Sequence, residues 1–223
     1  MGLFSRRRSD EPEETPAEPT PESAHGPWDV EDKPDLEGRI DLGAVRVPAR
    51  PGMQIRVELD RGTRAPVSLT MTQGGSALQL QVFAAPRTAS LWDEVRPELS
   101  ESVTDRGGTC DDVPGEFGRE LIAKLPVTTQ GGMGMRAVRF VGVDGPRWMI
   151  RGAFSGKAAL DPDEAAPLEG VLRDVVVVRG SQARPPREVL TLTLPGTAEV
   201  AEPAPDDDPL GILRRGPEIT ETR

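Results

Sequence analysis

The sequence predicts an α+β fold, with a largely antiparallel sheet, about two packed helices and disordered acidic tails at both ends. Three observations lead to this prediction. Apolar and polar residues alternate over several short segments, which is the period of half-buried strands. Two other segments carry apolar residues at helical spacing. Proline and acidic residues are concentrated toward the two ends of the chain.

The charge distribution sets the expected domain boundaries. Residues 1–38 form a Pro/Glu-rich arm with four Lys/Arg and eleven Asp/Glu, and residues 196–223 carry three and seven. Residues 39–195 carry 20 and 19, so this middle part is nearly neutral. Segments like the two ends bury too little apolar surface to offset the entropy of ordering, so we expect both to be disordered. A single α+β domain is therefore expected over residues 39–195.

The first half of this domain is expected to contain three strands and a helix. Residues 53–59, 67–72 and 78–82 alternate strictly, and a further early strand is possible around residues 40–47. Apolar residues then recur at helical spacing from Leu91. Thr88 or Ser90 is suited to cap this helix, Pro97 to bend it, and Gly107-Gly108 to end it.

The second half repeats this plan. Strands are expected at residues 121–127, 135–143 and 147–155, a helix at about 163–173, and two more strands at 175–178 and 189–194. The order is βββα-βββα-ββ, and the half-polar strands indicate a sheet covered on one face. Thr72-Gln73-Gly74-Gly75 and Thr129-Gln130-Gly131-Gly132 stand at matching places. They indicate either an internal duplication or two ordinary Gly-Gly hairpin turns.

The segment GPRWMIRGAFSG, residues 145–156, interleaves aromatic residues with arginines. A four-residue loop over residues 144–147 would oppose Val143 to Trp148, Val141 to Ile150 and Ala137 to Phe154, whereas a three-residue loop would oppose Val141 to Met149. The four-residue register sends Trp148, Ile150 and Phe154 to one face and into the core. A single-strand nucleic-acid binder needs aromatics and cations on the same exposed face, so this geometry argues against one.

The side chains of the folded part limit the chemistry that it can perform. The single histidine, His25, lies in the acidic arm, and the chain contains no tyrosine. Ser-His-Asp and Cys-His catalysis are therefore not expected. Cys110 is the one cysteine, which forbids an intramolecular disulfide and fits a reducing cytoplasm. With no His or Lys nearby, its thiol is not expected to be reactive. We expect a cytoplasmic, non-enzymatic binding or adaptor protein with a protein partner and no cofactor.

Two alternative functions each rest on a group of residues. A metal-dependent enzyme would use a loop containing Asp111, Asp112 and Glu116, although the same residues are also ordinary turn formers. A nucleic-acid or nucleotide binder would use an arginine-bearing sheet face, which the acidic tails disfavour. Its residues would be Arg136, Arg139, Arg147 and Arg151.

The tails offer two candidate contact segments. The C-terminal tail contains a short apolar and basic island, which is a candidate partner motif or a segment that packs on the parent domain. Its candidate residues are Leu210, Ile212, Leu213, Arg214 and Arg215. At the other end, Leu3-Phe4 beside Arg6-Arg7-Arg8 would support only weak peripheral contact with a membrane. No run of apolar residues is long enough to span a bilayer.

Several of these features together resemble a known family. They are the opening Met1-Gly2-Leu3-Phe4-Ser5-Arg6-Arg7-Arg8, the acidic Pro-rich arm, the Leu91-Trp92 helix and the run Arg147-Trp148-Met149-Ile150-Arg151-Gly152. The chain is similar in these respects to the actinobacterial domain-of-unknown-function 3710 family over most of its length. The resemblance implies an actinobacterial cytoplasmic protein, and it brings no catalytic residues.

Overall fold

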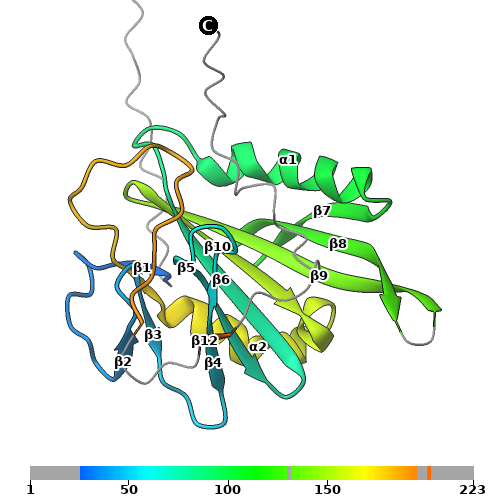
Figure 1. Ribbon diagram of the computed structural model, residues 1–223, viewed down its shortest axis with the longest axis horizontal. Helices are drawn as coiled ribbons and strands as arrows, with labels where there is room; N and C mark the ends of the chain where they lie inside the picture. The colour runs from blue at the N-terminus through cyan, green and yellow to red at the C-terminus, as the bar shows by residue number, and fades with distance from the viewer. Residues whose placement is uncertain (1–25, 130–131, 195–199, 202–223) are drawn as a thin grey trace, which may run out of the picture.

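The computed structural model describes residues 26–129, 132–194 and 200–201, and its main feature is an eight-stranded sheet (Figure 1). The strand order is β12-β4-β5-β6-β10-β9-β8-β7, and the neighbours are antiparallel except that β12 runs parallel to β4. The strands are β4 (Gln54–Leu59), β5 (Pro66–Gln73), β6 (Ser76–Ala84), β7 (Thr109–Gly115), β8 (Gly118–Thr129), β9 (Gly132–Gly145), β10 (Trp148–Ser155) and β12 (Val200–Ala201). The predicted α+β class is confirmed.

A second, smaller sheet has the order β1-β11-β3-β2. It consists of β1 (Trp28–Asp29), β2 (Arg39–Asp41), β3 (Val45–Pro48) and β11 (Val176–Val177). Residues 26–38 were expected in the disordered arm, but β1 pairs with β11, so the fold begins earlier than predicted. The carboxylate of Asp29 accepts a hydrogen bond from Trp148 Nε1 at 2.6 Å. The Pro-rich, acidic composition of this segment gives no indication of the contact between Asp29 and Trp148.

Both predicted helices are present. Helix α1 (Leu91–Asp105) begins after Ser90, whose hydroxyl accepts a hydrogen bond from Asp93 N. The carboxylate of Asp144 also accepts from Leu91 N at 2.9 Å, which secures the helix start to the end of β9. Helix α2 (Pro162–Asp174) follows a short 3₁₀ turn, η1 (Gly156–Ala159), and is capped by Asp161.

The core lies in two layers, one on each face of the large sheet. Helix α1 packs on β7, β8 and β9, and α2 packs on β3 and β6. The α2 side contains Trp148, Ile150 and Phe154, while the α1 side contains Phe83 and Met149. The expectation that one face is covered is therefore wrong, because successive residues of β10 are buried on both faces. The two helices also lie on opposite faces of the large sheet. An internal duplication about a twofold axis between β6 and β10 would instead place both helices on the same face.

The β9–β10 hairpin is tighter than predicted. Trp148 pairs with Gly145 and Ile150 with Val143, so the loop is the two residues Pro146 and Arg147. Neither predicted register is correct, but the observed register differs from the four-residue one by an even number of residues. Because side chains alternate with a period of two, Trp148, Ile150 and Phe154 still face the core together.

Two other elements also differ from their predictions. Residues 109–115 were expected in a turn-rich loop, yet all seven pair with β8 as the edge strand β7. The pairing overrides the local turn preference of the Asp, Pro and Gly residues. Residues 189–194, expected as a strand, form only an isolated bridge between Val189 and Phe83. Leu190 and Leu192 of this segment are nevertheless buried. At the C-terminal end, β12 lies within the stretch expected to be tail.

Candidate binding surface

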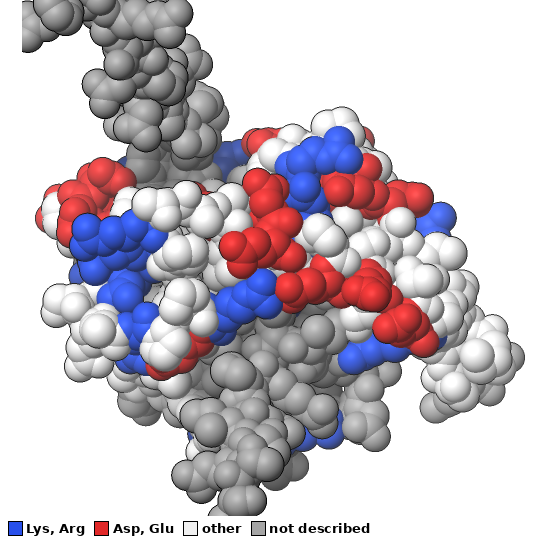
Figure 2. Space-filling view, turned by 90° about the horizontal axis from the view of Figure 1, so that it is seen from above, with Lys and Arg blue, Asp and Glu red and all other residues white. Residues whose placement is uncertain are grey.

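The outward side of α1 is strongly acidic. Its carboxylates are Asp93, Glu94, Glu98, Glu101 and Asp105. The opposite stripe of the helix is apolar and buried, and consists of Leu91, Trp92, Val95, Leu99 and Val103. Figure 2 looks at the protein from above, and acidic side chains form a band across this face with basic groups beside it. The helical period thus concentrates negative charge on the one side of α1 that faces solvent.

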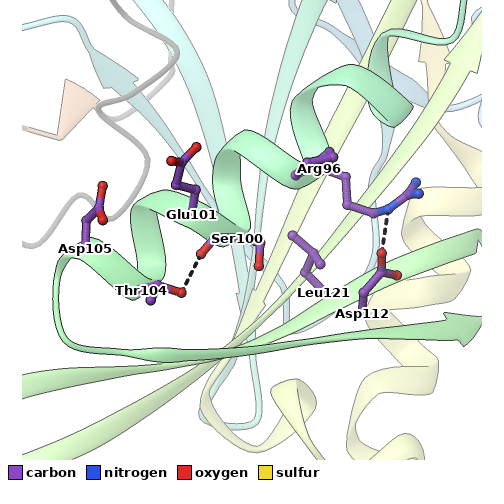
Figure 3. Close-up of a pocket in the computed structure, with 8 residues that line it drawn as sticks. Arg96, Ser100, Glu101, Thr104, Asp105, Asp112 and Leu121 are labelled. Atoms are coloured by element: carbon purple, nitrogen blue, oxygen red, sulfur yellow. Dashed lines mark hydrogen bonds and ion pairs between the residues drawn. The ribbon is translucent and has the colours of Figure 1, made fainter.

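A shallow, open groove of about 480 Å³ runs between α1 and the strands β7 and β8. Its walls are Arg96, Pro97, Ser100, Glu101, Thr104 and Asp105 from the helix, with Asp112 and Leu121 from the strands. In Figure 3, Arg96 and Asp112 reach toward each other, and Leu121 lies between the helix and the sheet. The groove therefore combines a small apolar floor with a charged rim.

Charge compensation differs between the two ends of this groove. Arg96 binds Asp93 at 2.6 Å and Asp112 at 3.0 Å, and Arg119 binds Asp112 at 2.9 Å. The hydrogen bond from Arg96 lowers the pKa of Asp93 against its partial burial. At the other end, Glu101 and Asp105 form no ion pair with any described residue. This end leaves two carboxylates exposed to solvent.

The predicted metal loop does not assemble. Asp111 and Asp112 are adjacent on β7, so their side chains point to opposite faces of the sheet. Asp112 is held by Arg96 and Arg119, while Glu116 pairs with Arg173 of α2. Within the described ranges, no three potential ligands come close enough to share a metal ion. The sequence predicted a loop for these residues, and a loop prediction does not show that Asp111 and Asp112 point to opposite faces of a sheet.

The four candidate arginines do not share one face. On β9, Arg136 lies on the α1 side and Arg139 on the α2 side. Arg147 occupies the hairpin turn with φ of 64°. Arg151 lies on the α1 side, but it is only 1% exposed and its guanidinium lies 5.4 Å from the centroid of the Phe83 ring. The expected arginine-bearing sheet face is therefore wrong in its geometry, because strand parity and the α1 layer separate these side chains.

The sequence reasoning missed a buried ion cluster on the α2 side. Arg139 lies between Glu169 of α2, at 2.5 Å, and Glu120 of β8, at 3.6 Å. Arg173 of α2 also contacts Glu169, at 3.8 Å. Burial raises the pKa of Glu120, and the hydrogen bond from Phe117 N and the charge of Arg139 oppose this shift. No sequence signal marks the cluster, because its members come from two strands and a distant helix.

Burial raises the pKa of the Cys110 thiol, which agrees with the expectation of an unreactive cysteine. The candidate partner motif at residues 210–215 and the basic segment near the N-terminus lie outside the described residues. Neither helix in the described part of the chain is long and apolar enough to cross a membrane.

Comparison with known proteins identifies a family and a distant structural likeness. A family model described as "Protein of unknown function (DUF3710)" matches residues 26–201. No curated protein sequence matches the chain. Among solved structures, the chain is similar to the solution structure of cyanobacterial PsbP (CyanoP) from Synechocystis sp. PCC 6803. The identity is 13%, the TM-score is 0.38, and the match covers 62% of this chain and 91% of that one.

Proposed function

Because the chain belongs to the DUF3710 family, which is described only as being of unknown function, we propose its function from its surface. We propose a cytoplasmic, non-enzymatic binding or adaptor protein whose α1 groove binds a basic segment of a partner protein. The observation that carries the proposal is the open groove with two exposed carboxylates, Glu101 and Asp105, at one end.

The shape and charge of the groove favour a protein segment as the occupant. Small-molecule sites are concave and enclose most of the ligand, whereas this groove is largely open to solvent. The exposed Pro97 offers an apolar contact in the groove, and the rim offers carboxylates to Lys or Arg side chains. Each exposed ion pair contributes only about 0.2–1 kcal/mol, so binding has to rest on several contacts together. Charge of this kind speeds association and decides between partners more than it raises affinity.

The proposal is tested with a labelled oligo-arginine peptide in fluorescence anisotropy titrations at about 0.15 M salt. The double variant Glu101→Gln/Asp105→Asn removes the two exposed charges at little steric cost. Loss of two contacts worth about 0.2–1 kcal/mol each weakens binding by about 2-fold to 30-fold. Binding to the unaltered protein is expected to weaken steeply as salt is added, because exposed charges are screened.

A matched control removes the same charge elsewhere. Asp32 and Asp35 are exposed in the β1–β2 connection, remote in sequence from α1. Asp32→Asn/Asp35→Asn should leave the affinity within about 2-fold, because long-range attraction to net charge is weak at physiological salt. Equal losses in both double variants would show that the peptide responds to net charge, and the proposed groove would be rejected.

A further inference from the structure

The β8–β9 strand pair has a projecting segment that no neighbouring described strand covers. Strand β7 pairs with β8 only as far as Lys124, and β10 pairs with β9 only from Val138. Beyond these points, residues 125–129 of β8 and 132–136 of β9 pair with each other and with no further described strand. Figure 1 shows the two strands extending at the right past the end of α1. These two segments are called the arm below.

The arm combines exposed apolar side chains with positive charge. Met133 and Met135 are 78% and 58% exposed. Alternation along the paired strands places both on the same face as Lys124, which is exposed at the base of the arm. Residues 121–143 contain no Asp or Glu, in a chain whose net charge is −10. Met133, Met135 and Lys124 are called the contact face below, because they offer apolar area and a cation together.

The contact face cannot occupy the α1 groove of its own chain. Its base is fixed, because Thr109, which follows shortly after α1, pairs with Lys124. Leu125, the next residue of β8, is buried in the layer on the α1 side of the sheet. Successive residues of a strand point to opposite faces, so the contact face is directed away from α1. A groove that receives these side chains therefore belongs to another molecule.

The α1 groove offers the complementary groups at a matching spacing. Pro97 is an exposed apolar contact, and Glu101 and Asp105 are exposed carboxylates at one end. Pro97 and Asp105 are about 12 Å apart along the helix axis. Met133 lies about 14 Å from Lys124 along the arm. A methionine and the lysine of one arm can thus meet the apolar and the acidic part of a groove at the same time.

We propose that the α1 groove binds the arm of a second copy of this chain, with the methionines at Pro97 and Lys124 at Glu101 and Asp105. This pairing rests on the proposed function, because it specifies the partner for the same groove. The arm and the groove are different parts of the surface, so the contact joins copies head to tail. Repetition of such a contact builds an open chain or closes into a ring.

The test is sedimentation velocity of the full-length chain at about 0.15 M salt, which screens the repulsion between two acidic copies. Glu101→Lys and Lys124→Glu each turn an attraction into a repulsion and should weaken self-association about tenfold. Asp35→Lys and Arg87→Glu make the same changes of net charge at exposed positions outside the arm and the groove. Both controls should associate like the unaltered chain.

Mixing decides whether the contact forms between copies. Chains with Lys124→Glu keep an unaltered groove, and chains with Glu101→Lys keep an unaltered arm. An equimolar mixture should therefore associate about tenfold more tightly than either variant alone. Met133→Ser/Met135→Ser should also weaken association, because the apolar part of the contact is lost. Oligo-arginine should compete with the arm and dissociate the assembly.

The outcomes separate this pairing from the proposed function. A chain that stays monomeric, but whose groove binds oligo-arginine through Glu101 and Asp105, would refute the pairing and leave the proposed function standing. Association that neither reversal weakens, or that mixing does not restore, would also refute the pairing. A monomeric chain that binds anionic lipid vesicles, and loses this binding with Lys124→Glu, would assign the arm to a membrane surface and overturn the proposal. Loss of peptide binding together with a monomeric chain would reject both.

Discussion

The bond between Asp29 and Trp148 is expected to be the main attachment of β1 to the large sheet. The indole Nε1 donates to Asp29 Oδ2 at 2.6 Å, and the other carboxylate oxygen accepts from Glu31 N at 2.9 Å. Trp148 is 1% exposed and Asp29 is 8% exposed, so water cannot easily replace the carboxylate. Asp29→Ala therefore leaves a buried indole N–H without its acceptor.

The magnitude follows from the two lost contacts. A hydrogen bond to a charged group contributes about 1.5–3 kcal/mol, and the bond to Glu31 N adds about 0.5–1 kcal/mol. Asp29→Ala should thus lower the free energy of unfolding by about 2–4 kcal/mol. Asp29→Asn keeps a carbonyl acceptor of the same shape and should cost only about 1 kcal/mol.

Urea unfolding at neutral pH, followed by tryptophan fluorescence, measures both variants. With a slope of about 2 kcal/mol per molar urea, the midpoint of Asp29→Ala should fall by about 1–2 M. The slope itself should stay unchanged if the fold is intact. The reasoning is refuted if Asp29→Ala costs less than about 1 kcal/mol, or if the alanine and asparagine variants are equally destabilised.

Two further predictions concern the two helical layers. A Cβ at Gly142 would lie 2.1–2.5 Å from ring atoms of Trp92, so Gly142→Ala should lower stability by about 1–3 kcal/mol in thermal melts. Gly62→Ala, with 3.5 Å to the nearest atom, serves as its near-neutral control. Because burial raises the pKa of Glu120 above its usual 4.5, the folded protein holds this proton more tightly than the unfolded chain does. The free energy of unfolding should therefore fall as pH rises from about 4.5 through the folded pKa, and Glu120→Gln should flatten that fall; parallel curves would contradict the argument.

The strands and helices were predictable to the extent that each has a period of its own. The alternation at residues 53–59 and the helical stripe from Leu91 mark elements that bury one side, and both were found close to the predicted bounds. Strand β7 was not predictable, because Asp and Pro, the residue types at positions 111, 112 and 114, are typical of turns. They are held in a strand by pairing with β8. A sequence cannot show that a partner strand overrides a local preference.

The candidate sites were less predictable than the fold. The sequence does not distinguish the surroundings of Arg139 and Arg151. In the structure, Arg139 lies in an ion cluster against α2, whereas Arg151 is buried on the α1 side. The groove beside α1 had no counterpart in the sequence reasoning, although the helical stripe already placed the acidic residues opposite the apolar ones. The sequence did not show that β7 lies beside α1, where it contributes to the second wall of the groove.

By itself, the sequence determined the α+β class, the two helices, the inward direction of Trp148, Ile150 and Phe154, and the concentration of acidic charge at the two ends. These follow from local periodicity and composition, which depend on neighbours in the chain. The tertiary structure alone decided that both sheet faces are covered, that β1 and β12 join the sheets, and which charges meet. Such features depend on contacts between residues far apart in sequence, such as Asp29 and Trp148, and no local pattern encodes them.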